Sequence, residues 1–170
     1  MHFKVSSKHL SLASRRFKIM LRGNWEEAKT VHEDGCRHVT LDSGFDPGAL
    51  KLLLDIIHGK TSKVPRSLNL EMLAKLSVLV DDFECYEEVD VFVDIWLDSL
   101  PISPPTEYGR DLVLWILVSS VFRKSELYKS TTRTAILRST EPIQTLGLPV
   151  RGIIVGKSSQ SIILYKLSRI

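Results

Sequence analysis

The strongest constraint on the fold is a segment near the middle of the chain whose apolar residues recur at helical spacing. Counted from the first of them, they occupy positions 0, 3, 4, 7, 8 and 11: Val89, Phe92, Val93, Trp96, Leu97 and Leu100. This spacing predicts an amphipathic α-helix over Glu87–Leu100, with its acidic residues on the opposite side. Because a one-sided helix must bury its apolar face, the rest of the chain has to supply packing partners.

Several further segments are predicted to be helices because they combine apolar periodicity with residues that begin or end helices. Ser7 is the expected N-cap and Gly23 the expected end of the first one, whereas Asp46-Pro47 begins and Gly59 ends the second. Asn69 caps the third. The predicted helices are Lys8–Arg22, the residues between Asp46-Pro47 and Gly59, Leu70–Asp82, Arg110–Phe122 and Ser125–Ser139. The Arg110–Phe122 helix is apolar nearly all round, so we expect it to be buried.

Short alternating segments predict strands at several places. They are His2–Ser6, His38–Asp42 and two possible segments of a terminal hairpin, Val150–Val155 and Ser161–Leu167. The expected fold class is therefore α+β and predominantly α-helical, with a helical cluster flanked by a small β-sheet. We expect one domain over 1–100, a proline-rich linker over 101–108, a helical extension over 109–141 and an irregular or β-hairpin tail over 142–170.

Charge is unevenly distributed along the chain. The net charge of +3 divides into +4 for residues 1–40, −7 for 41–100 and +6 for 101–170. Neither basic part is concentrated enough to predict a nucleic-acid interface. No apolar run is long enough to cross a bilayer, and the first residues do not resemble a signal peptide. With only two cysteines, the sequence favours a location in the cytoplasm or nucleus with reduced thiols.

The residues that could carry chemistry do not form a known catalytic pattern, and we expect no enzyme activity, no cofactor and no small-molecule substrate. His32, Cys36 and His38 are residue types that bind zinc, but their spacing is not that of a structural zinc site. We interpret them as incidental loop residues and expect no metal site. A small metal-dependent enzyme remains the alternative interpretation of these three residues.

An acidic run lies between Asp81 and Asp98, where eight acidic residues occur without a basic one. Asp90, Asp94 and Asp98 share one stripe of the predicted helix, because they are four residues apart. The simpler interpretation is a solvated helix face. The functional interpretation is a docking surface for a basic partner.

The N-terminal part of the chain resembles the BTB/POZ family, including BTB proteins of filamentous fungi. The resemblance is carried by Phe3–Ser14 with Phe17 and Met20-Leu21, by Val39–Leu41, by Phe45–Gly59 and by Met72–Cys85. It covers roughly residues 1–100. The helices that follow are similar to the helical extension of those proteins. The chain is expected to lack the first strand of the family, so that the resemblance is to an N-terminally truncated domain.

This resemblance implies a protein-interaction module without a catalytic centre. Many members of the family dimerise, and many are substrate adaptors that bind the cullin scaffold of a ubiquitin ligase. In such adaptors a hydrophobic-x-acidic motif follows the helix that here ends near Met20 and Leu21, and Trp25-Glu26-Glu27 matches it. The implied partner-binding residues are therefore Met20, Leu21, Trp25 and Glu27, and the implied partner is a cullin scaffold or another BTB chain. A nucleic-acid-associated regulatory factor and a truncated, non-functional copy are the alternatives.

Overall fold

The computed structural model describes residues 2–22, 32–41, 44–100 and 103–138. Over these ranges the protein is predominantly helical and contains no β-strand. The elements are α1 (Ser7–Ala13), α2 (Arg15–Arg22), α4 (Pro47–Ile57), the short 3-10 helix η1 (Thr61–Lys63), α5 (Leu70–Phe83), α6 (Tyr86–Ser99), α7 (Arg110–Val121) and α8 (Ser125–Arg138).

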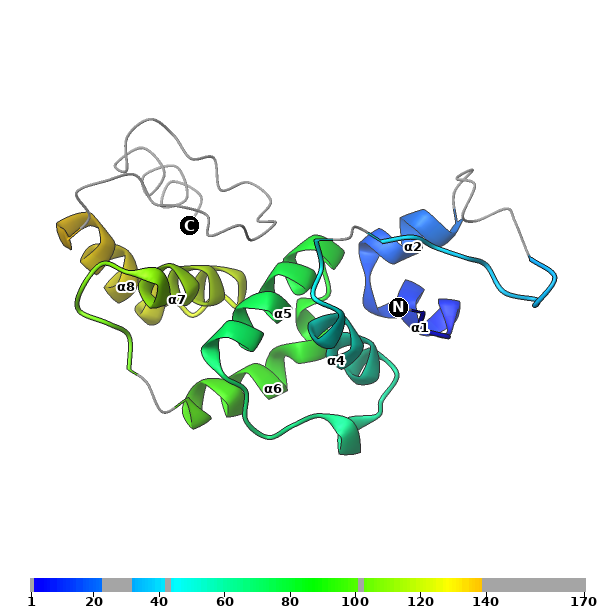
Figure 1. Cartoon of the computed structure of the whole chain (residues 1–170), viewed down its shortest axis with the longest axis horizontal. Coiled ribbons are helices and arrows are strands. Elements are labelled where there is room, and N and C mark those ends of the chain that lie inside the picture. The colour runs from blue at the N-terminus through cyan, green and yellow to red at the C-terminus, as the bar shows by residue number, and fades with distance from the viewer. Residues whose placement is uncertain (1, 23–31, 42–43, 101–102, 139–170) are drawn as a thin grey trace.

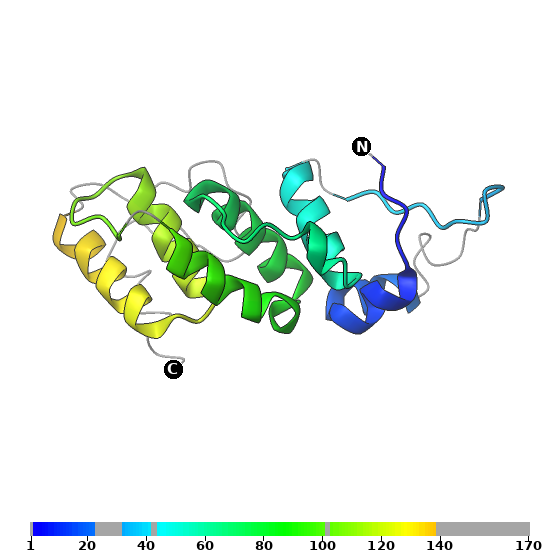
Figure 2. The same cartoon turned by 90° about the horizontal axis from the view of Figure 1, so that it is seen from below.

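Helix α5 lies at the centre of the arrangement. It packs against α2, α4, α6 and α7, while α7 in turn packs against α8. The molecule is elongated, with α1 and α2 at one end and α7 and α8 at the other (Figures 1 and 2). A single hydrophobic cluster extends through this arrangement from Leu10 in α1 to Phe122 after α7. The described helices therefore share one core.

The C-terminal end of α5 connects the first two helices to this core. The Phe83 ring is stacked on the Phe17 ring of α2 with centroids 4.4 Å apart, and the Phe45 ring lies 5.6 Å away at a tilt. The guanidinium of Arg16 lies over the Phe83 ring, and the same group is hydrogen-bonded to the Asp82 carboxylate. Stacking and cation–π contact at one ring thus hold α2 against α5.

The predicted single helix over Lys8–Arg22 is wrong, because the structure divides it at Ser14. This residue has extended backbone angles, φ −135° and ψ 122°. Its buried hydroxyl donates to the Phe83 carbonyl oxygen at 2.6 Å and accepts from the Phe17 amide at 3.0 Å, in the manner of an N-cap. The periodicity continues across the break because both halves bury their apolar residues in the same core. The N-cap of α1 is Ser6 rather than the predicted Ser7.

The small flanking β-sheet expected from His2–Ser6 and His38–Asp42 is not present in the described residues, which include 2–6 and 38–41. An alternating pattern forms a strand only where a second strand pairs with its backbone groups. Here the Ser6 amide donates instead to the imidazole of His58 at 2.9 Å. Phe3, Val39 and Leu41 still pack against the core and are partly buried, which accounts for the apolar residues of the pattern without a strand. The predicted terminal hairpin lies outside the described residues.

The other predicted helices are confirmed to within one residue at each end. The Asp46 carboxylate caps α4 by accepting from the amides of Gly48 and Ala49, both at 2.9 Å, and Asn69 caps α5. Gly59 follows α4 in a left-handed conformation, φ +68°, that favours glycine. Helix α7 is buried on most of its surface, as its apolar composition predicts.

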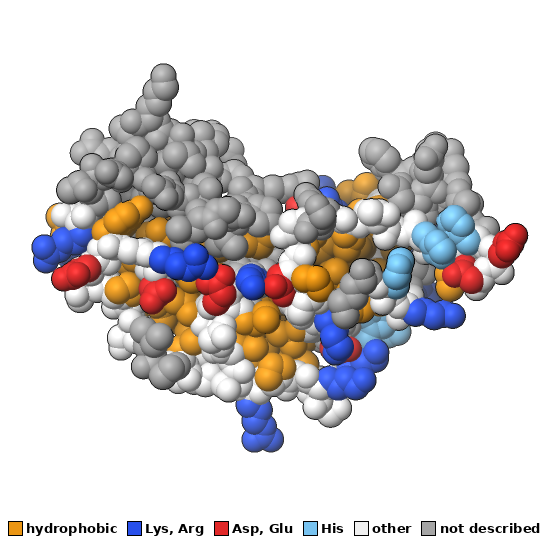
Figure 3. All heavy atoms as spheres, in the orientation of Figure 1, with side chains coloured by type: hydrophobic (Ala, Val, Ile, Leu, Met, Phe, Trp, Pro, Cys, Tyr) orange, Lys and Arg blue, Asp and Glu red, His pale blue; other side chains and the backbone are white. Residues whose placement is uncertain are grey.

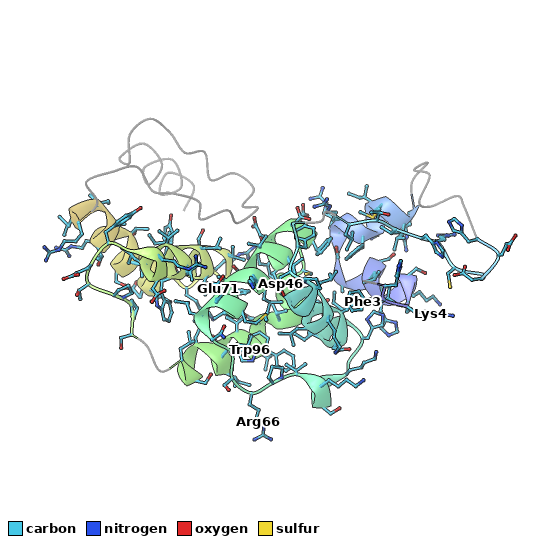
Figure 4. All side chains as sticks on the ribbon, viewed as in Figure 1. Phe3, Lys4, Asp46, Arg66, Glu71 and Trp96 are labelled. Carbon is cyan, nitrogen blue, oxygen red and sulfur yellow. The ribbon has the colours of Figure 1, made fainter. Side chains whose placement is uncertain are left out.

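Two contacts join the later helices to α5 and to the loop before it, and one residue of each contact, Trp96 and Glu71, is labelled in Figure 4. The buried indole of Trp96 in α6 donates from Nε1 to the Pro65 carbonyl oxygen at 2.8 Å, holding the loop that precedes α5. At the start of α5, Glu71 forms an ion pair of 2.6 Å with Arg110 at the start of α7. These contacts join residues 31 and 39 positions apart in the sequence.

The break at Ser14 predicts a measurable loss of stability on Ser14→Ala. Two hydrogen bonds are lost and the buried Phe83 carbonyl is left without its hydroxyl donor, so the free energy of unfolding should fall by about 1–3 kcal/mol. Urea unfolding followed by circular dichroism measures this change. Ser77→Ala is the matched control, because Ser77 is equally buried but bonds only to Ala74 within its own helix. Equal effects of the two substitutions would contradict the role given to Ser14.

The two tryptophans of the core predict different effects of the same substitution. Trp115 is also buried, but its Nε1 has no hydrogen-bond acceptor among the described residues. Trp96→Phe should therefore destabilise the protein by about 1–3 kcal/mol more than Trp115→Phe, since only the first leaves a carbonyl oxygen unpaired. Thermal or urea unfolding of both variants measures the difference. A larger loss from Trp115→Phe would contradict the assignment.

Candidate functional site

The four residues predicted to bind a partner fall into two groups. Trp25 and Glu27 lie outside the described residues. Leu21 is buried in the core, and Met20 is partly buried and packs against it. The described half of the predicted site therefore supports α2 against α5, and other residues of α1 and α2 face the solvent.

The exposed surface of the first two helices contains two large apolar side chains. Leu12 on α1 is 84% exposed and Ile19 on α2 is 55% exposed. Beside Ile19, three basic residues lie on the exposed side of α2: Arg15, Lys18 and Arg22. We call Arg15, Lys18, Ile19 and Arg22 the basic surface. Exposed apolar side chains next to charged ones are a common composition for protein-binding surfaces.

Sequence reasoning missed Leu12 and Ile19, although a signal for them exists. The apolar residues that predicted the first helix occur at Leu10, Ala13, Phe17, Met20 and Leu21. Leu12 and Ile19 do not belong to that series. A large apolar residue outside the buried stripe of an amphipathic helix has to be exposed or covered by a partner.

Helix α6 presents a second surface, of opposite charge. Val91 is 73% exposed and Ile95 is 48% exposed, and acidic residues lie beside them on the solvent side of the helix. We call this the acidic surface; it consists of Glu87, Asp90, Val91, Asp94, Ile95 and Asp98. The predicted acidic stripe is thus exposed, and the structure adds an apolar pair next to it that the stripe alone did not indicate.

Each surface contains one residue already engaged in an ion pair. Asp94 on the acidic surface is paired with Lys124, which follows α7, and this contact ties α6 to the turn before α8. Arg15 on the basic surface lies 3.9 Å from the Glu84 carboxylate, with both side chains largely exposed. Pairs of this kind contribute little stability in water, so both residues can also contact a partner.

The residues considered for zinc lie in a tight turn at the α1–α2 end of the molecule, where histidine side chains gather in Figure 3. The imidazoles of His32 and His38 are stacked with centroids 4.0 Å apart, and His38 Nε2 lies 3.0 Å from the Asp34 carboxylate. The hydrogen bond from His38, together with one from the Cys36 amide, holds the pKa of Asp34 below its usual value. In the described part of the chain, no group of three or more His, Cys, Asp or Glu side chains could hold a metal ion.

A second histidine pair joins the N-terminal segment to α4. His58 Nδ1 lies 2.8 Å from the Leu54 carbonyl oxygen, and its Nε2 accepts from the Ser6 amide. An amide can only donate, so the proton of this imidazole is on Nδ1 and the ring is neutral. The His9 ring stacks on it at 5.1 Å. This arrangement gives His58 a structural role in positioning α1.

Comparison of the chain with protein-family models, with curated proteins and with solved structures finds no match. Among the helices of the described residues, none has the length and apolar character needed to cross a membrane. The two surfaces are therefore the features of the described residues that bear on function.

The two cysteines should differ in reactivity. Cys85 is buried between α5 and α6, and this burial raises the pKa of its thiol to about 12, whereas Cys36 is partly exposed. Since the thiolate is the reactive form, a thiol reagent at pH 8 should modify Cys36 rapidly and Cys85 only after unfolding. Mass spectrometry of the peptides measures this, with Cys36→Ser as the control. Fast labelling of both thiols in the folded chain would contradict the placement of Cys85.

Proposed function

We propose that this protein is an interaction module of the BTB/POZ type that binds a partner protein through its α1–α2 end. The observation that carries the proposal is the pair of exposed apolar residues, Leu12 and Ile19, on two consecutive helices. They directly precede the segment that contains Trp25 and Glu27, the residues matching the hydrophobic-x-acidic motif of BTB adaptors. The resemblance and the exposed residues thus favour neighbouring parts of the sequence.

The physical basis of this proposal is the composition of the α1–α2 end. Large apolar side chains that remain in water carry an unfavourable hydration free energy, which a partner removes when it covers them. The neighbouring basic residues Arg15, Lys18 and Arg22 would orient an acidic or mixed partner surface. The finer proposal is a substrate adaptor that docks on the cullin scaffold of a ubiquitin ligase, or an oligomerisation domain.

The adaptor proposal predicts binding of the full chain to the N-terminal domain of a cullin scaffold. Titration calorimetry should detect a complex that is weakened about tenfold or more by Trp25→Ala or Glu27→Lys, since truncating an interface anchor typically costs more than 1 kcal/mol. Leu12→Ala with Ile19→Ala should also weaken it. Ile136→Ala is the control, because Ile136 is an exposed apolar residue on α8 at the other end of the molecule.

Two results would refute the adaptor proposal. One is the absence of cullin binding by a chain whose circular dichroism is that of a folded helical protein. The other is binding that none of the α1–α2 or Trp25 and Glu27 substitutions weakens more than the Ile136→Ala control does.

A further inference from the structure

The basic and acidic surfaces carry the same residue pattern with opposite charge. In α2 the sequence runs basic, basic, apolar, basic at positions 0, 3, 4 and 7, and in α6 it runs acidic, acidic, apolar, acidic at the same positions. The first set is Arg15, Lys18, Ile19 and Arg22, and the second is Glu87, Asp90, Val91 and Asp94. On each helix the three charged residues form one row along the surface, and the apolar residue lies beside that row. Viewed from the N-terminus, the apolar residue lies on the same side of the row in α2 as in α6.

This shared pattern selects one relative orientation for the two helices. When two helices face each other in parallel, the apolar side of one meets the charged side of the other. When they are antiparallel, the two apolar sides meet and the two charged rows meet. Antiparallel packing would therefore place Ile19 against Val91 and Ile95, and the basic row of α2 against the acidic row of α6. Such a contact combines apolar burial with charge complementarity.

The two surfaces do not meet within one chain. Each helix packs against the core with its other side: Phe17 and Leu21 of α2 are buried, as are Val89, Val93 and Trp96 of α6. Ile19, Val91 and Ile95 remain exposed. In both Figure 1 and Figure 2, α2 and α6 lie apart, with α2 at one end of the molecule and α6 in its middle part.

We propose that α2 of one copy of this chain docks antiparallel on α6 of a second copy. The inference rests on the proposed function, protein binding at the α1–α2 end, and names a partner for it. Because the two surfaces differ, the contact is heterologous, and a pair of copies retains one unused surface of each kind, one on each copy, unless the assembly closes. Association should therefore increase steadily with concentration.

The contact is small, and this sets the conditions of the test. A single helix pair lies at the low end of specific interface sizes, so we expect a weak and reversible association. Its charged part should be screened by salt, because the Debye length falls from about 10 Å at 0.1 M to about 3 Å at 1 M ionic strength. Sedimentation velocity of the full chain over concentrations up to about 0.5 mM covers the range of such affinities.

The variants reverse the charge of one surface at a time. Lys18→Glu with Arg22→Glu changes the basic surface. Asp90→Lys with Asp98→Lys changes the acidic surface and leaves the Asp94–Lys124 ion pair intact. Each double variant should weaken self-association about tenfold or more, since like charges then face each other. Lys129→Glu with Arg133→Glu on α8 is the matched control for the first variant, because it changes the net charge by the same amount at exposed positions.

Mixing the two double variants gives the sharpest result. The reversed α2 of one then faces the reversed α6 of the other, and the two unchanged surfaces also match, so the mixture should regain the association that each variant alone has lost. Ile19→Asp should abolish association of that variant with itself, and a mixture with the Lys18→Glu/Arg22→Glu variant should not recover, because neither chain then carries an intact basic surface. Circular dichroism establishes that each variant is folded.

Three outcomes would overturn the inference: a chain that stays monomeric up to about 0.5 mM at low salt, association that the control weakens as much as the surface variants do, and a mixture that does not recover. Cullin titration of the same samples separates this inference from the proposed function. A monomeric chain that binds the cullin domain refutes only the contact between copies, whereas a self-associating chain that does not bind it refutes only the adaptor role.

Discussion

The burial of α5 is the interaction on which the rest of the described structure depends. Most of the apolar residues of α5 are fully buried, and helices α2, α4, α6 and α7 surround this helix. A helix that is apolar on several sides is unstable in water, and each neighbouring helix gains stability by covering one of those sides. Its C-terminal end supplies the Phe83 ring and carbonyl that hold α2 and Ser14 in place.

The helices could be predicted from the sequence because their signals are local. Asp46 and Asn69 cap the amides two or three residues ahead, and apolar spacing follows directly from the geometry of one helix. The break at Ser14 and the absence of paired strands in the described residues could not be predicted in this way. The Ser14 hydroxyl bonds to a residue 69 positions away and the Ser6 amide to one 52 positions away. Such long-range contacts produce no pattern in the sequence around either residue.

The candidate site was predictable only in part, for a related reason. The resemblance to the BTB/POZ family implies Met20 and Leu21 as partner-binding residues. Both belong to the helical apolar series of the first segment and therefore face the core. The exposed residues are the ones that depart from the series, such as Leu12, Ile19 and Val91. Apolar residues that follow the helical periodicity thus identify the core, and large apolar residues outside it identify the exposed positions that a partner could cover.

The continuity of the core has a consequence for how the chain unfolds. The proline-rich residues between α6 and α7 separate the first helices from α7 and α8 in the sequence. In the structure, however, α7 packs directly against α5, and Glu71 of α5 forms an ion pair with Arg110 of α7. Without α7, the apolar side of α5 that it covers would be open to water. The regions before and after the prolines therefore cover each other's apolar surface. We expect the described helices α1 to α7 to unfold as one cooperative unit, so that a destabilising substitution in either region lowers the stability of both.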